Sequence, residues 1–84
     1  MIGQARKKPI VVSFCSWEGD NIEEMATFTQ DTLVTREQPS NDLLIPTLEG
    51  IMRAQMGDYI IKGISEEYYP IKPWIFKETY DIII

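Results

Sequence analysis

The sequence contains no histidine, and this absence excludes more than any other feature of its 84 residues. Without histidine, the chain cannot build a Ser-His or Cys-His nucleophile pair, a His-ligated zinc site or the usual general base of neutral pH. Carboxylates, lysine, tyrosine and cysteine remain available for acid–base work. The composition therefore disfavours an enzyme without forbidding one, and we expect a non-enzymatic protein with no cofactor.

Cysteine and long apolar runs are also scarce. The single Cys15 excludes an internal disulfide and a cysteine-rich metal site. It stands in an apolar run without a neighbouring histidine or cation cluster, so we expect a buried, inert thiol. No apolar run approaches the ~20 residues of a membrane span, and no signal-peptide core follows the basic residues 6–8. A soluble cytoplasmic protein that does not bind a membrane is the prediction.

Basic residues are few, with 8 against 13 acids and a net charge of −5 at pH 7. This balance disfavours direct nucleic-acid binding, because neutralisation of phosphates by cations supplies most of that affinity. A chain of this length forms one domain. We expect residues 1–8 to form a flexible basic arm and residues 9–84 to form a single α+β domain.

The first regular elements are a strand and a helix. A β-branched and aromatic run predicts a strand over residues 10–17, with Ile10, Val12 and Phe14 on its buried face. Residues 20–24 have the spacing of a capping box, and their acids suit a helix N-terminus. A helix of two to two and a half turns is predicted to begin there.

Turn signals every seven to eight residues then predict antiparallel hairpins. Strands are expected at 33–35, 43–48, 51–55, 59–63, 67–71 and 79–84. Pro46 cannot donate a ladder hydrogen bond, so its strand is expected at an edge or at a bulge. Pro73 suits the first position of a short helical turn near 73–78. The predicted fold is α+β, with one short N-terminal helix packed on an antiparallel, meander-like β-sheet or a small, partly open barrel.

Aromatic and basic residues gather in the C-terminal half and form the candidate binding surface. Aromatic faces with nearby cations can stack a base and hold its phosphates, but the same aromatics can fill the core of a small domain. Adjacent tyrosines of a strand face opposite ways, so at least one should point away from the core, and Trp74 is expected to be exposed. The candidate ligand- or partner-binding residues are Arg53, Lys62, Tyr68, Tyr69, Lys72 and Trp74.

The C-terminal residues Ile82, Ile83 and Ile84 place apolar side chains on both faces of any strand that they form. At a sheet edge such a strand would pair between chains and make a homo-oligomer interface. In the centre of a sheet it would be buried on both faces. Both interpretations stay open.

Acids at positions 18, 20, 23 and 24 are close enough to raise the possibility of a divalent-cation site. They lack the alternating oxygen ligands and the glycine of a calcium loop, and capping accounts for two of them. We therefore predict no metal site.

Several motifs together resemble a family of small phage and prophage proteins, whose members carry TLEG-x-MRA, GD[YW]IIKG and GE[FY]YPCKPDIF-x-x-TY. The matching segments in this chain are TLEG at 47–50, MRA at 52–54, GDYIIKG at 57–63, EYYP at 67–70, KPWIF at 72–76 and TY at 79–80. The chain departs from the pattern at Glu66, Ile71 and Trp74, where glycine, cysteine and aspartate are usual. The resemblance implies phage origin but no catalytic residues, because no activity is assigned to the family.

Phage origin favours function by binding, by analogy with small acidic phage proteins that block or sequester host factors. We expect a binding protein in the host cytoplasm that neutralises a defence protein or a nucleotide-derived immune signal. With a nucleotide, Tyr69 or Trp74 would stack on the base while Arg53, Lys62 or Lys72 paired with phosphate. The alternative is a phage structural or assembly protein that acts through self-association.

Overall fold

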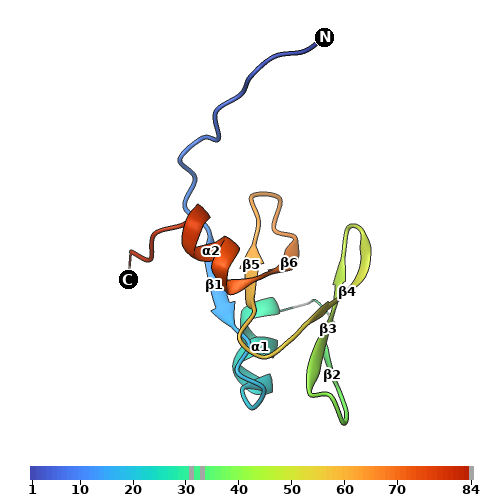
Figure 1. Cartoon of the computed structure of the whole chain (residues 1–84). Coiled ribbons are helices and arrows are strands. Elements are labelled where there is room, and N and C mark those ends of the chain that lie inside the picture. Colours follow the sequence, from blue (N-terminus) through green and yellow to red (C-terminus); the bar gives the residue numbers. More distant parts are fainter. Residues whose placement is uncertain (31, 33, 84) are drawn as a thin grey trace.

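The computed structural model has an α+β architecture of two small antiparallel sheets and two helices, which confirms the predicted class (Figure 1). It describes residues 1–83 except 31 and 33. The elements are β1 (Ser13–Ser16), α1 (Ile22–Thr29), β2 (Thr35–Glu37), β3 (Asp42–Thr47), β4 (Gly50–Ala54), β5 (Tyr59–Lys62), β6 (Tyr68–Ile71) and α2 (Pro73–Thr79). In the strand predicted at 33–35, Leu33 lies outside the described residues.

The described strands form two separate sheets and not one meander. The first sheet has the order β1-β5-β6, and the second has the order β2-β3-β4. Cys15 of β1 pairs with Ile60 of β5, so the chain leaves the first sheet, builds the second and then returns. The prediction of one meander-like sheet is therefore wrong, and the described strands form no closed barrel. Turn signals are local, and they do not determine which distant strands share a ladder.

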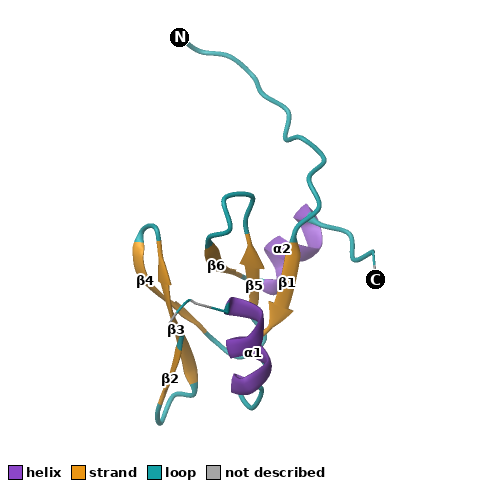
Figure 2. Ribbon diagram, turned by 180° about the vertical axis from the view of Figure 1, so that it is seen from behind, coloured by secondary structure: helices purple, strands orange, loops and turns teal. Residues whose placement is uncertain are grey.

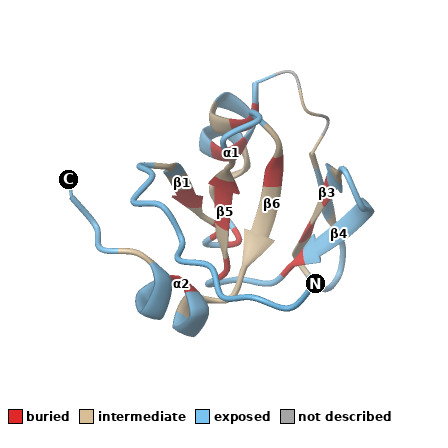
Figure 3. Cartoon of the chain, turned by 90° about the horizontal axis from the view of Figure 1, so that it is seen from above, coloured by how far each residue is buried: buried red, intermediate tan, exposed pale blue. Residues whose placement is uncertain are grey.

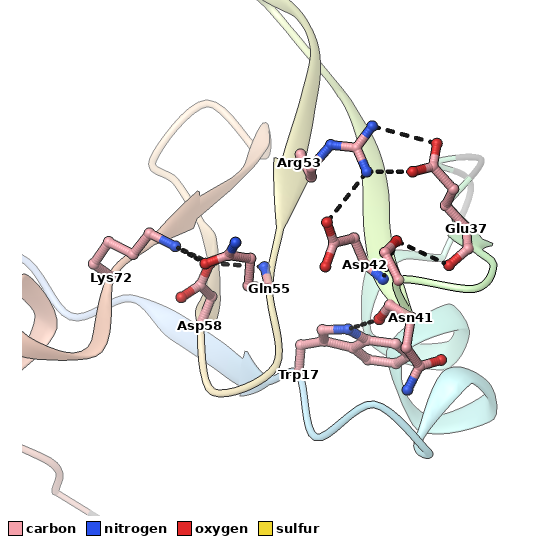
Figure 4. Close-up of polar contacts among 9 residues, drawn as sticks. Trp17, Glu37, Asn41, Asp42, Arg53, Gln55, Asp58 and Lys72 are labelled. Atoms are coloured by element: carbon pink, nitrogen blue, oxygen red, sulfur yellow. Dashed lines mark hydrogen bonds and ion pairs between the residues drawn. The ribbon is translucent and has the colours of Figure 1, made fainter.

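One core joins the two sheets and α1. Its buried members are Cys15, Trp17, Met25, Leu43, Ile45, Ala54, Ile60 and Tyr68. Figure 3 shows buried positions on β1, β5, β6 and β3. Trp17 follows β1 and is fully buried, and its Nε1 donates to the carbonyl oxygen of Asn41 at 3.0 Å (Figure 4). This contact ties the end of β1 to the turn between β2 and β3.

The buried face of the first strand differs from the prediction. Ile10 is exposed and β1 begins only at Ser13, while the buried side chains are Cys15 and Trp17, which have the opposite phase. Residues 10–17 are apolar on both faces of a strand, so the period of two does not identify the buried one.

Pro46 lies in the central strand of the second sheet, but it has a neighbour on one side only. The β2 ladder covers Asp42 to Leu44 of β3, while Pro46 pairs with Ile51 of β4. A proline is tolerated there because the missing N–H affects only an open side of the ladder.

The C-terminal segment is helical where a short helical turn was predicted near 73–78, and it is irregular where a strand was predicted. α2 extends from Pro73 to Thr79, and the Tyr80 N–H closes it on the carbonyl oxygen of Phe76 at 2.8 Å. Residues 80–83 form no strand, so the prediction of a strand over 79–84 is wrong for the described residues. Isoleucine favours a strand only where a partner strand is available, and the local sequence does not indicate whether one lies beside this segment.

The N-terminal residues 1–11 are exposed and have no regular secondary structure. They leave the domain beside α2 in both views (Figures 1 and 2). The Cα radius of gyration is 13.8 Å, against roughly 12 Å for a compact domain of this length. The difference is explained by this projecting arm.

Candidate functional site

A groove opens between two hairpins, β3–β4 and β5–β6, whose tips lie at the same end of the molecule (Figure 2). The hairpins pack together through buried side chains of the common core, such as Ile45 of β3 and Tyr68 of β6. Toward the tips they enclose a cavity of about 750 Å³. We call this cavity the hairpin groove.

Three parts of the chain line the hairpin groove. Residues 47–49 and Met52 form the β3–β4 wall, while residues 63–64 and 67–70 form the β5–β6 wall. Lys7, Ile10, Val12 and Tyr80 line the third side. The lining is mostly apolar with a few polar groups, which is the usual make-up of a ligand or partner site.

The strand pattern determines which side chains face the groove. On β4, Met52 lines the groove and the next residue, Arg53, points away from it because successive side chains alternate. On β6, Tyr68 is buried and stacks edge-on against Phe28 with ring centroids 5.6 Å apart, while Tyr69 is half-buried. The prediction that at least one of these tyrosines points away from the core agrees with this arrangement.

Polar groups line the groove on all three sides: Thr47 and Glu49 on the β3–β4 wall, Glu67 and Tyr69 on the β5–β6 wall, and Lys7 and Tyr80 on the third side. Lys7 Nζ lies 4.7 Å from the Tyr80 ring centroid, a cation–π contact. Burial, with a further contribution from the neighbouring Tyr80, raises the pKa of Tyr69 to about 12, so its hydroxyl stays protonated at neutral pH. Glu67 Oε1 is buried and has no hydrogen-bond partner among the described residues.

Arg53, predicted to bind phosphate, instead lies on the outer face of the second sheet in an ion-pair network. Its guanidinium contacts the carboxylate of Glu37 and lies 3.2 Å from Asp42 Oδ2 (Figure 4). The hydrogen bond from Arg53 lowers the pKa of Glu37, and the same contact raises the pKa of Arg53. This cation is therefore already paired.

Lys72 and Lys62 are also paired with acids. Lys72 Nζ lies 2.9 Å from Oδ2 of the buried Asp58 and 3.1 Å from Gln55 Oε1 (Figure 4). The same Asp58 oxygen accepts the Gln55 backbone N–H at 2.8 Å, so this cluster fastens the β4–β5 turn to the start of α2. Lys62 Nζ lies 3.8 Å from Oε1 of the exposed Glu66.

Trp74 lies on α2, and its exposed fraction of 62% confirms that it faces solvent. The structure therefore brings Tyr68 and Tyr69 together at the groove and places Arg53, Lys62, Lys72 and Trp74 outside its lining.

Sequence reasoning missed the apolar tips of the groove and Glu67. Leu48 and Ile64 lie in the turns of their hairpins, where polar residues are usual. Apolar side chains at predicted hairpin tips were the available signal. Glu67 gave no such signal, because an acid next to a turn is ordinary.

The C-terminal tail lies beside the segment that precedes β1. Ile82 and Ile83 are exposed and line a second cavity of about 650 Å³ with residues 9–14 and part of α2. Ile84, the third residue of the predicted oligomer interface, lies outside the described residues. No neighbouring strand pairs with the tail in the described part of the chain.

No metal centre is evident among the residues that the structure describes. No group of three acids or cysteines there is placed to hold a metal ion. Cys15 is buried, with its Sγ 3.7 Å from Glu24 Oε1, and burial together with the nearby acids raises its thiol pKa to about 11. The predicted burial of this thiol is confirmed. Neither described helix has the length and apolar character needed to cross a membrane.

Comparison of the chain with protein-family models, with curated proteins and with solved structures gives no match.

Proposed function

We propose that this chain is a phage-encoded, non-enzymatic protein that works in the host cytoplasm and neutralises a host defence protein by holding part of it in the hairpin groove. The phage origin rests on the motif resemblance in residues 47–80. Binding rather than catalysis is supported by the lack of histidine and by the raised thiol pKa of Cys15.

The observation that carries the proposal is the apolar mouth of the hairpin groove. Leu48 and Ile64, on opposite hairpins, have exposed fractions of 82% and 73%. Met52 lies below them and is also exposed. Exposed apolar side chains that surround a cavity mark an interaction site, because water contacts surface there that a partner would cover.

The pairing of the cations favours a protein partner over a nucleotide. Arg53, Lys62 and Lys72, the candidate phosphate ligands, all contact carboxylates. Lys7 is the lysine that lines the groove, and it lies on the Tyr80 ring. A nucleotide would have to displace these pairs, whereas an apolar protein segment would not.

Site-specific photo-cross-linking tests the proposal. A photoreactive phenylalanine analogue replaces Leu48 in one variant and the exposed Ile75 of α2 in a control variant. In infected host cells we expect one discrete adduct from position 48 and none from position 75. Excess wild-type protein should abolish the adduct, and excess Ile64→Asp protein should not. Equal adducts from both positions would contradict the groove as the binding surface.

Nucleotide sequestration is tested separately by thermal denaturation with cyclic dinucleotides and ADP-ribose derivatives. Because the candidate cations are paired, we expect no shift in melting temperature. Stabilisation by any of these ligands that Tyr69→Ala abolishes would favour the sequestration version instead.

Self-association through the tail is the second candidate function, favoured by the exposed Ile82 and Ile83. A stable homo-oligomer would bury these side chains against the segment before β1. Light scattering on the full chain and on a chain that lacks residues 82–84 measures this. A lower mass for the shortened chain would support assembly, and an unchanged monomer mass in both would remove it.

A further inference from the structure

We infer that the segment held in the hairpin groove carries a lysine or arginine side chain that pairs with Glu67, between apolar neighbours that cover Leu48, Met52 and Ile64. This inference rests on the proposed function, and it names the chemistry of the occupant. The basic side chain belongs to a partner protein, and the occupant is not a free amine.

The Glu67 carboxylate, on the β5–β6 wall of the groove, has a buried oxygen without a counterpart among the described residues. Its Oε1 is buried and accepts no hydrogen bond, and Glu67 forms no ion pair within 4.0 Å among the described residues. The nearest basic residue in sequence, Lys62, pairs with Glu66 instead. A carboxylate that is partly removed from water gains from a charged donor more than an exposed one does.

Gly63 makes room for this carboxylate. A Cβ atom at position 63 would lie 1.6 Å from Glu67 Oε1, so any side chain there would push the carboxylate away from its place. The turn is closed by hydrogen bonds from the Gly63 N–H to the Glu67 carbonyl and from the Glu66 N–H to the Gly63 carbonyl, at 2.7 and 3.0 Å. The backbone thus holds Glu67 at the wall of the groove.

The charge of the surrounding surface also favours a basic occupant. Residues 9–84 carry five bases against 13 acids, and of the three bases at positions 6–8 Lys7 lines the groove, where it lies over the Tyr80 ring. Both walls of the groove carry a carboxylate, Glu49 on one and Glu67 on the other. Such a field attracts a cationic segment and repels an anionic one.

The apolar part of the occupant follows from the same walls. Leu48, Met52 and Ile64 are exposed around the cavity, and Tyr68 lies deeper in its lining. A basic side chain alone would leave these surfaces in water, whereas apolar neighbours of that side chain would cover them. A segment of alternating apolar and basic character meets both requirements.

Three blocked tripeptides with one central residue changed are suitable probes: acetyl-Leu-Lys-Phe-amide, acetyl-Leu-Gln-Phe-amide and acetyl-Leu-Glu-Phe-amide. Amide chemical shifts of the ¹⁵N-labelled full chain are followed during titration. We expect shifts at Gly63, Ile64 and Glu67, with the lysine peptide binding at least three-fold tighter than the glutamine peptide. The glutamate peptide should bind weakest.

Two variants of equal net charge distinguish the effect of the Glu67 carboxylate from the effect of the protein's overall negative charge. Glu67→Gln should reduce the ratio of the affinities for the lysine and glutamine peptides, which we call the lysine preference, to about one. Glu78→Gln, on the exposed part of α2, should leave this ratio unchanged. Gly63→Ala, which leaves the charge of Glu67 intact, should also lower the preference. Circular dichroism of each variant checks that the fold is retained.

The outcomes distinguish this inference from the proposed function. If no peptide shifts the groove amides, the hairpin groove is not a binding surface and both fail. If the peptides shift the groove amides without charge preference, or if Glu67→Gln and Glu78→Gln behave alike, the basic occupant is wrong and groove binding stands.

Discussion

Replacing Trp17 by phenylalanine perturbs the contact that joins the two sheets below the hairpin groove. Trp17 is fully buried, and its Nε1 donates to the carbonyl oxygen of Asn41 at 3.0 Å. Asn41 in turn donates through its side-chain amide to the carbonyl oxygen of Gly19 at 2.7 Å. The indole is therefore both a core side chain and the donor that fixes the β2–β3 turn.

The expected loss of stability has two parts. Phenylalanine has no N–H, so the Asn41 carbonyl loses its donor at a cost of about 1–3 kcal/mol. The smaller ring leaves roughly 40 Å³ empty, which at about 24 cal/mol per Å³ adds about 1 kcal/mol. The sum is about 2–4 kcal/mol. This is a large part of the roughly 4–13 kcal/mol expected for a domain of this length.

Urea unfolding followed by circular dichroism measures this loss, with Trp74→Phe as the matched control. Trp74 is 62% exposed, so its replacement should change the free energy of unfolding by less than about 0.5 kcal/mol. The melting temperature of Trp17→Phe should fall on the order of 10–30 °C. Trp17→Phe and Trp74→Phe unfolding at the same urea midpoint would refute the role given to the indole.

Three further predictions concern charged and titratable groups. Lys72→Met should lower the free energy of unfolding by about 1–2 kcal/mol, because it leaves the buried Asp58 without its ion pair, while Lys72→Arg should cost less. Because the Cys15 thiol has a pKa of about 11 in the folded state and 9.0 in the unfolded state, its contribution to stability is fully present below about pH 9 and is lost as the pH rises toward 11. Urea midpoints of the wild type should therefore fall between pH 9 and 11, and Cys15→Ala should remove this fall. Glu37 has the opposite pH dependence, because its pKa is lowered in the folded state. Its contribution to the free energy of unfolding is present above pH 4.5 and is lost as the pH falls through the folded-state pKa. The carboxyl resonance of Glu37 should therefore titrate below 4.5 in the wild type and return to that value in Arg53→Gln.

The α+β class was predictable from the sequence because its signals are local. Glycine and polar turn residues separate the strands, and Pro73 precedes α2. Sheet membership was not predictable, since the pairing of Cys15 with Ile60 spans most of the chain. The phase of the first strand failed for a related reason: both of its faces are apolar, and only the position of the second sheet decides which one is buried.

The candidate site was predictable in part. The aromatic cluster did identify Tyr68 and Tyr69, which line the hairpin groove. The ion pairs of the basic residues were not predictable, because Arg53 and Lys72 contact acids that are close in space and distant in sequence. Ion pairing of this kind depends on the packing of the two sheets, which no local pattern encodes.

The central claim, that the hairpin groove is the binding surface, is tested most directly by methyl NMR spectroscopy of the protein with the host factor identified by cross-linking. We expect the methyl resonances of Leu48, Met52 and Ile64 to shift or broaden on binding, while that of Ile75 stays in place. Shifts at Ile75 and Ile83 with unchanged groove methyls would contradict it.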